Sequence, residues 1–149
     1  MVNMEKIIIY IDGGSRGNPG QSACAAVFYD EAGKLIKEFT QYLGVGTNNE
    51  AEYQGLLLAF KKTKAFFGKD KIKKIAIEVR SDSELLIKQM QGKYKILEPK
   101  IQALFLQAWN LKIDFGVVGF LQIAREINKR ADKLVNETLD DEIKSQRLL

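Results

Sequence analysis

Residues 6–11 read KIIIYI, in which five consecutive positions are isoleucine or tyrosine. Runs of β-branched and aromatic residues without alternating polar positions are typical of strands that are buried on both faces. Such a strand needs neighbouring strands and helices over both faces, so this run already favours an α/β fold. The next residues are Asp12, Gly13 and Gly14, which place a carboxylate where the buried run ends.

The rest of the chain alternates between strand-like and helix-like patterns. Strands are predicted at 22–30, 33–43, 72–82 and 115–124, and helices at 47–67, 83–92, 98–111 and 128–139. Pro19 and Gly20 suit the two central positions of a type II turn, so the first three strands are expected to form an antiparallel meander. We predict a single α/β domain over residues 1–149, with a mixed sheet flanked by helices and a frayed polar tail at 138–149.

Histidine is absent and Cys24 is the only cysteine, which removes several classes of chemistry. Ser-His and Cys-His catalysis, imidazole metal ligands and an internal disulfide are excluded, and zinc sites normally need several Cys or His ligands. Cys24 lies in the apolar stretch ACAAVFY and is predicted to be a small buried side chain. Any catalysis has to come from carboxylates, lysines or a metal ion held by oxygen atoms.

The formal net charge of the chain is +4, and lysines crowd its middle between residues 61 and 100. A basic chain suits a polyanionic partner, although a solvated lysine face with no partner is the simpler explanation of the charge alone. No stretch is apolar for long enough to cross a bilayer, and the first residues, MVNMEKIIIYID, lack a leader-type cleavage site. The chain is therefore predicted to be cytoplasmic and to have no membrane partner.

The glycine-rich stretch at 12–20, DGGSRGNPG, is a poor match to phosphate-binding loops. No Gly-Lys-Ser/Thr follows it, and the next element is a strand, whereas phosphate loops and dinucleotide motifs need a helix N-terminus aimed at the phosphate. Gly13 and Gly14 carry no side chains, so a large ligand can approach the backbone beside Asp12. An aspartate that only stabilises a turn is an equally good explanation of this stretch alone.

Three other acids have ordinary structural explanations when each is taken alone. Glu52 lies in the first turns of a helix, where the dipole favours a carboxylate, but it shares a face with Asn48 and Asn49, whose amides can hydrogen-bond a sugar or a base. Asp82 ends an apolar strand and can cap the helix that follows it. Asp132 lies in the first turn of the last predicted helix, where the dipole again favours an acid.

Taken together, the four acids indicate a metal site. Asp12 and Asp82 end strands. Glu52 and Asp132 begin helices, so all four can lie on one rim of the sheet. Clustered carboxylates repel one another strongly unless cations neutralise them. Oxygen ligands without His or Cys favour Mg²⁺ or Mn²⁺.

Four motifs in this order make the chain resemble the type 1 ribonucleases H: YIDGGSRGNPG, TNNEAEY, VRSDSELLIKQMQGKYK and REINKRADKL. The match spans about residues 6–137, and the last motif is most similar to a branch of small bacterial and archaeal enzymes without a histidine there. The resemblance implies a ribonuclease-H-like fold, whose five-stranded mixed sheet has three antiparallel strands and then two parallel ones. It also implies an endonuclease that hydrolyses the RNA strand of RNA–DNA hybrids and leaves 5′-phosphate and 3′-hydroxyl ends.

The resemblance assigns metal binding and catalysis to four acids, Asp12, Glu52, Asp82 and Asp132. It implies that Asp12 bridges two Mg²⁺ ions and that Asp132 helps to hold the ion that activates water. Glu52 and Asp82 are expected to hold the ion that faces the leaving oxygen.

The same resemblance assigns substrate-binding residues. The RNA strand is expected near Gly13, Asn48 and Asn49, because its 2′-hydroxyls both donate and accept hydrogen bonds. A phosphate of the DNA strand is expected at Asn18 and Thr47. The set is completed by two residues of the last motif, Arg125 and Asn128.

The chain departs from many relatives at three points. The stretch IAREIN lacks a histidine thought to help product leave, and Arg125 or Glu126 is expected to replace it. Glu50 stands where some relatives have a basic residue, which predicts a weaker DNA-phosphate pocket. GKYKILEPK is too short for a basic, tryptophan-bearing protrusion, and Trp109 is predicted to lie in the core. Binding is expected to depend instead on three nearby lysines, Lys88, Lys93 and Lys95.

Two other classes of function stay open at this stage. A ribonuclease-H-like module can bind nucleic acid without cutting it, because one fold serves many functions, but such a module is expected to have lost at least one of the four acids. A small-molecule phosphate-binding domain is disfavoured by the missing loop chemistry. We interpret the sequence as that of a monomeric enzyme that acts on RNA–DNA hybrids with two Mg²⁺ ions per site, for which Mn²⁺ is an expected substitute.

Overall fold

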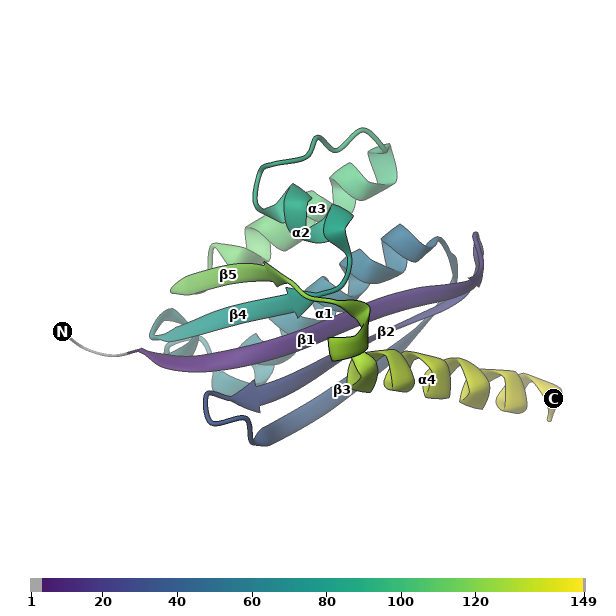
Figure 1. The fold of residues 1–149 in the computed structure, drawn as a ribbon, viewed down its shortest axis with the longest axis horizontal. Coiled ribbons are helices and arrows are strands. Elements are labelled where there is room, and N and C mark those ends of the chain that lie inside the picture. The colour runs from purple at the N-terminus through teal and green to yellow at the C-terminus, as the bar shows by residue number, and fades with distance from the viewer. Residues whose placement is uncertain (1–3, 149) are drawn as a thin grey trace.

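The computed structural model describes residues 4–148, which form one sheet with helices on both faces (Figure 1). The strands are β1 (Glu5–Gly17), β2 (Gly20–Asp30), β3 (Leu35–Gly46), β4 (Ile75–Ser81) and β5 (Val117–Gln122). The helices are α1 (Asn48–Phe67), α2 (Glu84–Met90), α3 (Pro99–Lys112) and α4 (Lys129–Arg147), with single 3-10 turns at Lys71–Lys73 and Arg125–Ile127. The described part leaves out residues 1–3 and residue 149. The first of these belong to the segment that was predicted to lack a leader.

The strand order β3-β2-β1-β4-β5 confirms the predicted mixed sheet. β2 pairs antiparallel with β1 and with β3, whereas β4 pairs parallel with β1 and with β5. β1 is therefore a central strand, and Ile7, Ile9 and Ile11 are at most 1% exposed. The unbroken apolar run is explained by this position, because helices cover both faces of the strand.

Two helical layers of different size cover the sheet (Figure 1). On one face, α1 with α2 and α3 builds the main core, in which Leu56, Phe60 and Cys24 are fully buried. On the other face, α4 packs Val135 and Leu139 into a smaller cluster. Burial raises the pKa of the Cys24 thiol to about 12, so this cysteine is an inert core residue.

β1 is longer than the sequence predicted. Its pairing with β4 stops at Tyr10, but its pairing with β2 continues to Gly17. Asp12 is thus not the end of a strand; it lies directly beyond the point where β1 separates from β4. The predicted turn was also wrong, because Gly17 pairs with Gly20, which makes Asn18 and Pro19 the two central residues instead of Pro19 and Gly20.

The C-terminal segment corrects a second prediction, because α4 continues to Arg147 and residues 138–147 are helical rather than frayed. Leu139 is 2% exposed against the sheet, and Asp140 forms a 2.7 Å ion pair with Arg16 of β1. These tertiary contacts stabilise the C-terminal part of α4 as a helix, although its sequence is mostly polar. Within residues 4–148, none of the helices has the length and apolar character needed to cross a membrane.

Trp109 was predicted to be a core residue, and this was wrong, because its side chain is 40% exposed. Ile101, Leu104 and Ala108 take the buried side of α3, and Trp109 lies beside them. Its ring stacks on Phe105 with the centroids 5.7 Å apart. A tryptophan inside an apolar helix pattern can therefore lie on its outer face.

Candidate active site

Asp12 and Asp82 meet at one edge of the sheet. Asp82 directly follows Ser81, the last residue of β4, and Asp12 lies just beyond the parallel pairing of β1 with β4. The carboxyl ends of two parallel neighbours lie at the same edge, so this topology brings two carboxylates together. Asp12 is buried, with 9% of its surface exposed, and Asp82 is half-buried.

Glu52 is delivered to the same place by an unusually close contact between α1 and β1. A Cβ atom added to Gly13 would lie 2.2 Å from the backbone carbon and oxygen of Ala51, and one added to Gly55 would lie 2.9 Å from the Asp12 carbonyl oxygen. The helix can rest on the strand backbone only because both positions are glycine. The N–H of Gly13 donates a 2.5 Å hydrogen bond to Glu52 Oε1. The missing side chain of Gly13 therefore makes room for the helix, while its backbone still lines the cleft.

Each of the carboxylates Asp12, Glu52 and Asp82 offers an oxygen within 4.8 Å of those of the other two. Burial, and then the charges of Asp82 and Asp132, raise the pKa of Asp12 to about 6, although hydrogen bonds from its surroundings oppose the shift. Burial and the charge of Asp12 likewise raise the pKa of Glu52 well above its usual value. The carboxylates are thus held close together at an energetic cost that a bound cation would relieve.

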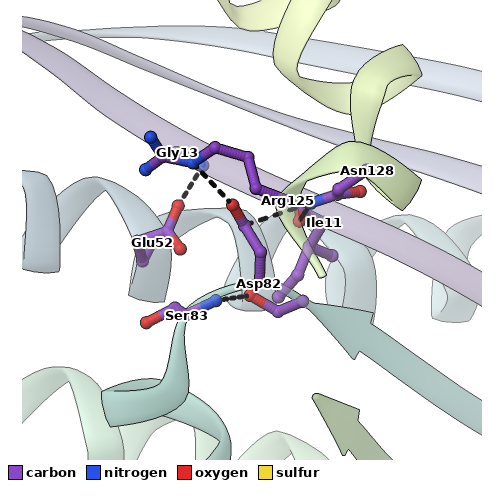
Figure 2. Close-up of polar contacts among 8 residues, drawn as sticks. Ile11, Gly13, Glu52, Asp82, Ser83, Arg125 and Asn128 are labelled. Carbon is purple, nitrogen blue, oxygen red and sulfur yellow. Dashed lines mark hydrogen bonds and ion pairs between the residues drawn. The ribbon is translucent and has the colours of Figure 1, made fainter. Parts of the chain in front are cut away.

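Asp82 is available for this cluster because another residue caps the helix that follows. The side chain of Ser83 accepts the hydrogen bond from the Leu86 N–H at 3.2 Å, so the capping explanation of Asp82 does not hold. Instead, Asp82 accepts hydrogen bonds at 3.3 Å from Arg125 Nε and from Asn128 Nδ2. Figure 2 shows the Asp82 carboxylate between Glu52 on one side and Asn128 on the other, with the Arg125 side chain passing above it.

Asp132 lies in the first turn of α4, is exposed, and lines the same cleft as Asp12 and Asp82. It is not among the three acids whose oxygens approach within 4.8 Å. Asn128, the residue before α4, ties this helix to the sheet by donating a 2.8 Å hydrogen bond from Nδ2 to the carbonyl of Ile11. The structure therefore brings three of the predicted acids together, and the fourth lines the same cleft.

The cleft consists of two adjoining depressions of about 210 and 270 Å³, both lined by Asp12, Asp82, Gly13 and Arg125. Asn48 lines both depressions, and its Oδ1 accepts hydrogen bonds from the N–H (2.9 Å) and the hydroxyl (3.1 Å) of one β1 residue, Ser15. The predicted RNA-contacting amides therefore lie beside the acids. Asn49 lines the depression that also contains Glu52.

The two residues predicted to bind a DNA phosphate are engaged with their own chain. Asn18 Oδ1 accepts a 3.0 Å hydrogen bond from the Asn48 N–H, and Thr47 caps α1 by accepting from the Glu50 N–H at 3.2 Å. The Thr47 hydroxyl donates to Glu50 Oε1 at 3.1 Å. Glu50 thus places a negative charge beside this pair of residues, as its position in the sequence suggested.

Ser15, Arg16 and Asn136 also line the cleft, although no pattern considered in the sequence selected them. Asn136 follows Asp132 by four residues, so the helical period places both on one face of α4. That spacing is a signal that could have identified Asn136. Ser15 and Arg16 belong to the extended part of β1, which the sequence pattern did not reveal.

An open, acid-lined cleft with amide groups on one wall can hold hard cations next to a polar, anionic substrate. Its polar groups are carboxylates, amides, hydroxyls and the two guanidinium groups of Arg16 and Arg125. This chemistry suits a phosphodiester more than an apolar ligand.

Comparison with known proteins finds a matching family model, similar solved structures and similar curated proteins. A family model described as reverse transcriptase-like matches residues 10–138. The crystal structure of LC11-RNase H1 in complex with an RNA/DNA hybrid is 43% identical, with a TM-score of 0.87, over 92% of this chain and 99% of the other. Ribonuclease HI of Halobacterium salinarum is 37% identical over 136 residues.

The curated relatives are longer than the matched region. The match to the halobacterial protein covers 91% of this chain and 65% of the relative. The bifunctional protein Rv2228c of Mycobacterium tuberculosis is 36% identical over 138 residues, which is 91% of this chain and 36% of that relative. The chain therefore spans less than two thirds of these relatives.

Proposed function

Because this chain belongs to the type 1 ribonuclease H family, we propose that it is an endonuclease that hydrolyses the RNA strand of RNA–DNA hybrids. The products would carry 5′-phosphate and 3′-hydroxyl ends. The observation that carries the proposal is the carboxylate cluster at the sheet edge, in which Asp12, Glu52 and Asp82 present oxygens within 4.8 Å of one another. Asp132 lines the same cleft and completes the set of four acids.

The acids fit divalent cations of the hard class. Each of the four residues offers only oxygen ligands, and the pKa values of Asp12 and Glu52 are raised first by burial and then by the neighbouring carboxylates, so a bound cation would favour their charged forms. We assign Asp12, Glu52, Asp82 and Asp132 as the ligands of two Mg²⁺ ions, with Mn²⁺ as a substitute. When bound, such ions stabilise the attacking and leaving oxygens of an in-line displacement.

The chain's own residues would position the hybrid around this cluster. Asn48, Asn49 and the Gly13 backbone would read the 2′-hydroxyls of the RNA strand, because amides can both donate to and accept from a hydroxyl. Asn18 and Thr47 would hold a DNA phosphate, after exchanging the internal hydrogen bonds that they now make.

Asn128 donates to Asp82 and would keep its carboxylate directed into the cleft, while Arg125 forms an ion pair with the same carboxylate. Arg125 is largely exposed and can also reach a phosphate of the RNA strand, which fits its assignment as a substrate contact. Since phosphates dominate contacts with basic grooves, hybrid binding should weaken as the salt concentration rises.

The alternative is a module that binds hybrids without cutting them. A labelled RNA–DNA hybrid incubated with wild-type protein and Mg²⁺, and in parallel with Mn²⁺, separates the two. We expect internal cuts in the RNA strand only, and a loss of at least about 10³-fold in rate for Asp12→Asn, since the metal ligand set is broken.

Asp70→Asn is the matched control, because Asp70 is exposed and makes no capping hydrogen bond through its side chain. It should cut at the wild-type rate. Hybrid that is bound but left intact by the wild-type protein would support the binding module and reject the nuclease. We also propose that residues 1–149 act as a single monomeric domain, which light scattering in the same buffer tests. The proposed cytoplasmic location of the protein is tested by cell fractionation.

A further inference from the structure

The most basic stretch of the chain lies at the end of α1 and in the turn that follows it. Residues 61–74, called the basic surface below, contain seven lysines and a single acid, Asp70, so they carry a formal charge of +6, whereas the whole chain carries +4. All seven lysines are exposed. Acids pair with two of them, Lys64 and Lys71. Within residues 4–148, no ion pair compensates the other five, which are Lys61, Lys62, Lys69, Lys73 and Lys74.

The basic surface and the acid cluster lie at opposite ends of β4 (Figure 1). The basic surface directly precedes Ile75, the first residue of β4, whereas Asp82 follows the last residue of that strand. Along α1, the rise from Glu52 to Phe66 is about 21 Å at the usual helical spacing. The basic surface is therefore separate from the cleft that is proposed to hold the RNA–DNA hybrid.

An exposed aromatic ring lies within this concentration of charge. Phe66 is 52% exposed, and its ring meets the ring of Phe67 edge to face, with the centroids 5.0 Å apart and the planes at 79°. Phe67 packs against the main core and thus supports its neighbour from the protein side. Lys62 precedes Phe66 by one helical turn, so both side chains lie on the same exposed face of α1.

The neighbouring strand β3 extends this pattern of lysines and rings. The ammonium groups of Lys37 and Lys62 lie over the ring of Phe39, at 5.9 and 5.4 Å from its centroid. Lys71 lies over the ring of Phe67 in the same way, at 5.3 Å. Such cation–π contacts keep lysine side chains close to the protein while their charge stays accessible to solvent.

The helix end explains little of this arrangement. Lysine is favoured in the last turn of a helix by the dipole, which accounts for Lys64, but four of the seven lysines lie beyond Phe67, where α1 ends. A solvated lysine face would account for the charge alone. It gives no reason for an exposed aromatic ring on the same face.

Lysines interleaved with an exposed ring match single-stranded nucleic acid. Ammonium groups neutralise phosphates, and an unpaired base of almost any sequence can stack on an aromatic side chain. In a duplex the bases are already stacked on one another, so their faces are not available to the ring. An acidic peptide would match the charge but offers few flat rings for Phe66.

We propose that the basic surface binds single-stranded DNA, with phosphates on Lys62 and Lys69 and a base stacked on Phe66. The binding chemistry is independent of the nuclease reaction. The choice of DNA rests on the proposed function, because hydrolysis of the RNA strand leaves the DNA strand unpaired beside the enzyme. Residues 61–74 contain no asparagine or glutamine, so this stretch offers no side-chain amide to read a 2′-hydroxyl.

Fluorescence anisotropy of the full chain with a labelled oligothymidylate of about 15 nucleotides tests the proposal, in chelator so that no strand is cut. Phe66→Ala should weaken binding at least about fivefold, because one base loses its stacking partner. Phe66→Trp keeps an aromatic ring and should bind as the wild type does, whereas Phe66→Leu keeps only apolar surface and should bind as weakly as Phe66→Ala. Leu106→Ala, at a 57% exposed position in α3, is the matched control and should leave the affinity unchanged.

Two further oligonucleotides separate stacking and DNA choice from charge. An abasic strand of the same length keeps every phosphate but has no base, so it should bind at least about fivefold more weakly and should not respond to Phe66→Ala. An oligouridylate of the same length should bind no more tightly than the oligothymidylate. Equal affinity for the abasic strand, or tighter binding of the oligouridylate, would overturn the proposal.

The salt dependence tests the lysines. The double variant Lys62→Gln/Lys69→Gln removes two phosphate contacts, so the slope of log K against log salt should become shallower by about 1.4. Lys34→Gln/Lys144→Gln makes the same change of net charge at two exposed positions elsewhere and should keep the wild-type slope. Absence of saturable binding at low salt, wild-type affinity in Phe66→Ala, or equal slopes in the two double variants would contradict the assignment.

A cutting assay distinguishes failure of this proposal from failure of the proposed function. With Mg²⁺ and a short blunt-ended hybrid, Phe66→Ala should cut at the wild-type rate, because that substrate has no unpaired strand. A wild-type protein that binds the oligothymidylate through Phe66 but leaves the hybrid intact would reject the nuclease and keep the binding surface. A protein that cuts the hybrid but does not bind the oligothymidylate would reject the binding surface alone.

Discussion

Glu52 and Asp132 each lie near the N-terminus of a helix that packs on the sheet, yet the two helix ends are held in different ways. At α1, the helix backbone rests directly on the backbone of β1, Gly13 donates to Glu52, and the carboxylate is 9% exposed. At α4, larger side chains such as Val135 separate helix and sheet, and Asp132 is exposed.

The difference shows that the acid cluster has a rigid half and an adjustable half. Close backbone packing leaves the α1 side no room to shift, so Glu52 and Asp12 stay together even though their charges repel. The α4 side is connected to the acids mainly through the hydrogen bonds of Asn128. We expect substitutions on the α1 side to change stability strongly and those on the α4 side to change it little.

The largest effect is expected for Gly13→Ala. The new Cβ would lie 2.2 Å from the Ala51 backbone, so α1 has to move away from β1, and the free energy of unfolding should fall by more than about 3 kcal/mol. Gly14→Ala is the matched control, because its nearest contact would be Val135 Cγ1 at 3.8 Å. Urea unfolding of both variants measures this effect. Equal stability of the two variants would show that α1 is not held rigidly against β1.

Asp12→Asn should stabilise the metal-free protein. The pKa of Asp12 is raised from 3.8 to about 6, so the folded state binds this proton more tightly than the unfolded state. The Asp12 contribution to the free energy of unfolding therefore falls as pH rises from about 4 to about 6. Removing the charge should add on the order of 1–3 kcal/mol at pH 7 and flatten that pH dependence.

Urea unfolding in chelator between pH 4 and pH 7 measures the Asp12 effect, with Asp70→Asn as the exposed control. Saturating Mg²⁺ should reverse the order and make the wild type the more stable protein, because only its cluster gains from the cation. A lower stability of Asp12→Asn in chelator at pH 7 would mean that the acids do not strain one another.

Asn128→Ala tests the connection to α4. It leaves the buried Ile11 carbonyl without its donor but also removes the unpaired Oδ1, so the net loss of stability should be only about 1 kcal/mol. Asn110→Ala, an exposed change in α3, is the control. Thermal unfolding checks the magnitude, and a loss as large as that of Gly13→Ala would show that both halves are equally rigid.

Arg125→Gln should have the smallest effect on stability, under about 0.5 kcal/mol, because its side chain is 87% exposed. Since Arg125 competes with cations for Asp82, Mg²⁺ should bind a few-fold more tightly to the variant, as calorimetry can measure. Lys69→Gln, a similar loss of charge at an exposed position, should leave Mg²⁺ affinity unchanged. Weaker Mg²⁺ binding by Arg125→Gln would indicate that Arg125 orients Asp82 rather than competing for it.

Some of these features could be read from local pattern alone. The apolar run at 7–11 identified the central strand, and helical periodicity identified α1, because burial on one or both sides imposes a period that survives in the sequence. Four acids at strand ends and helix starts predicted one cluster at a sheet edge. Their residue types, with no histidine in the chain, limited the candidate metals to hard cations.

Tertiary structure alone decided how those acids are held. Glycine at 13 suggested room for a ligand, but the space is taken by a helix that lies 39 residues further along the chain. The length of β1, the helical tail and the exposed face of Trp109 likewise depend on distant partners: β2, the sheet and α1. Such contacts join residues far apart in sequence, so no local period records them, whereas apolar patterning and charge are properties that each segment carries by itself.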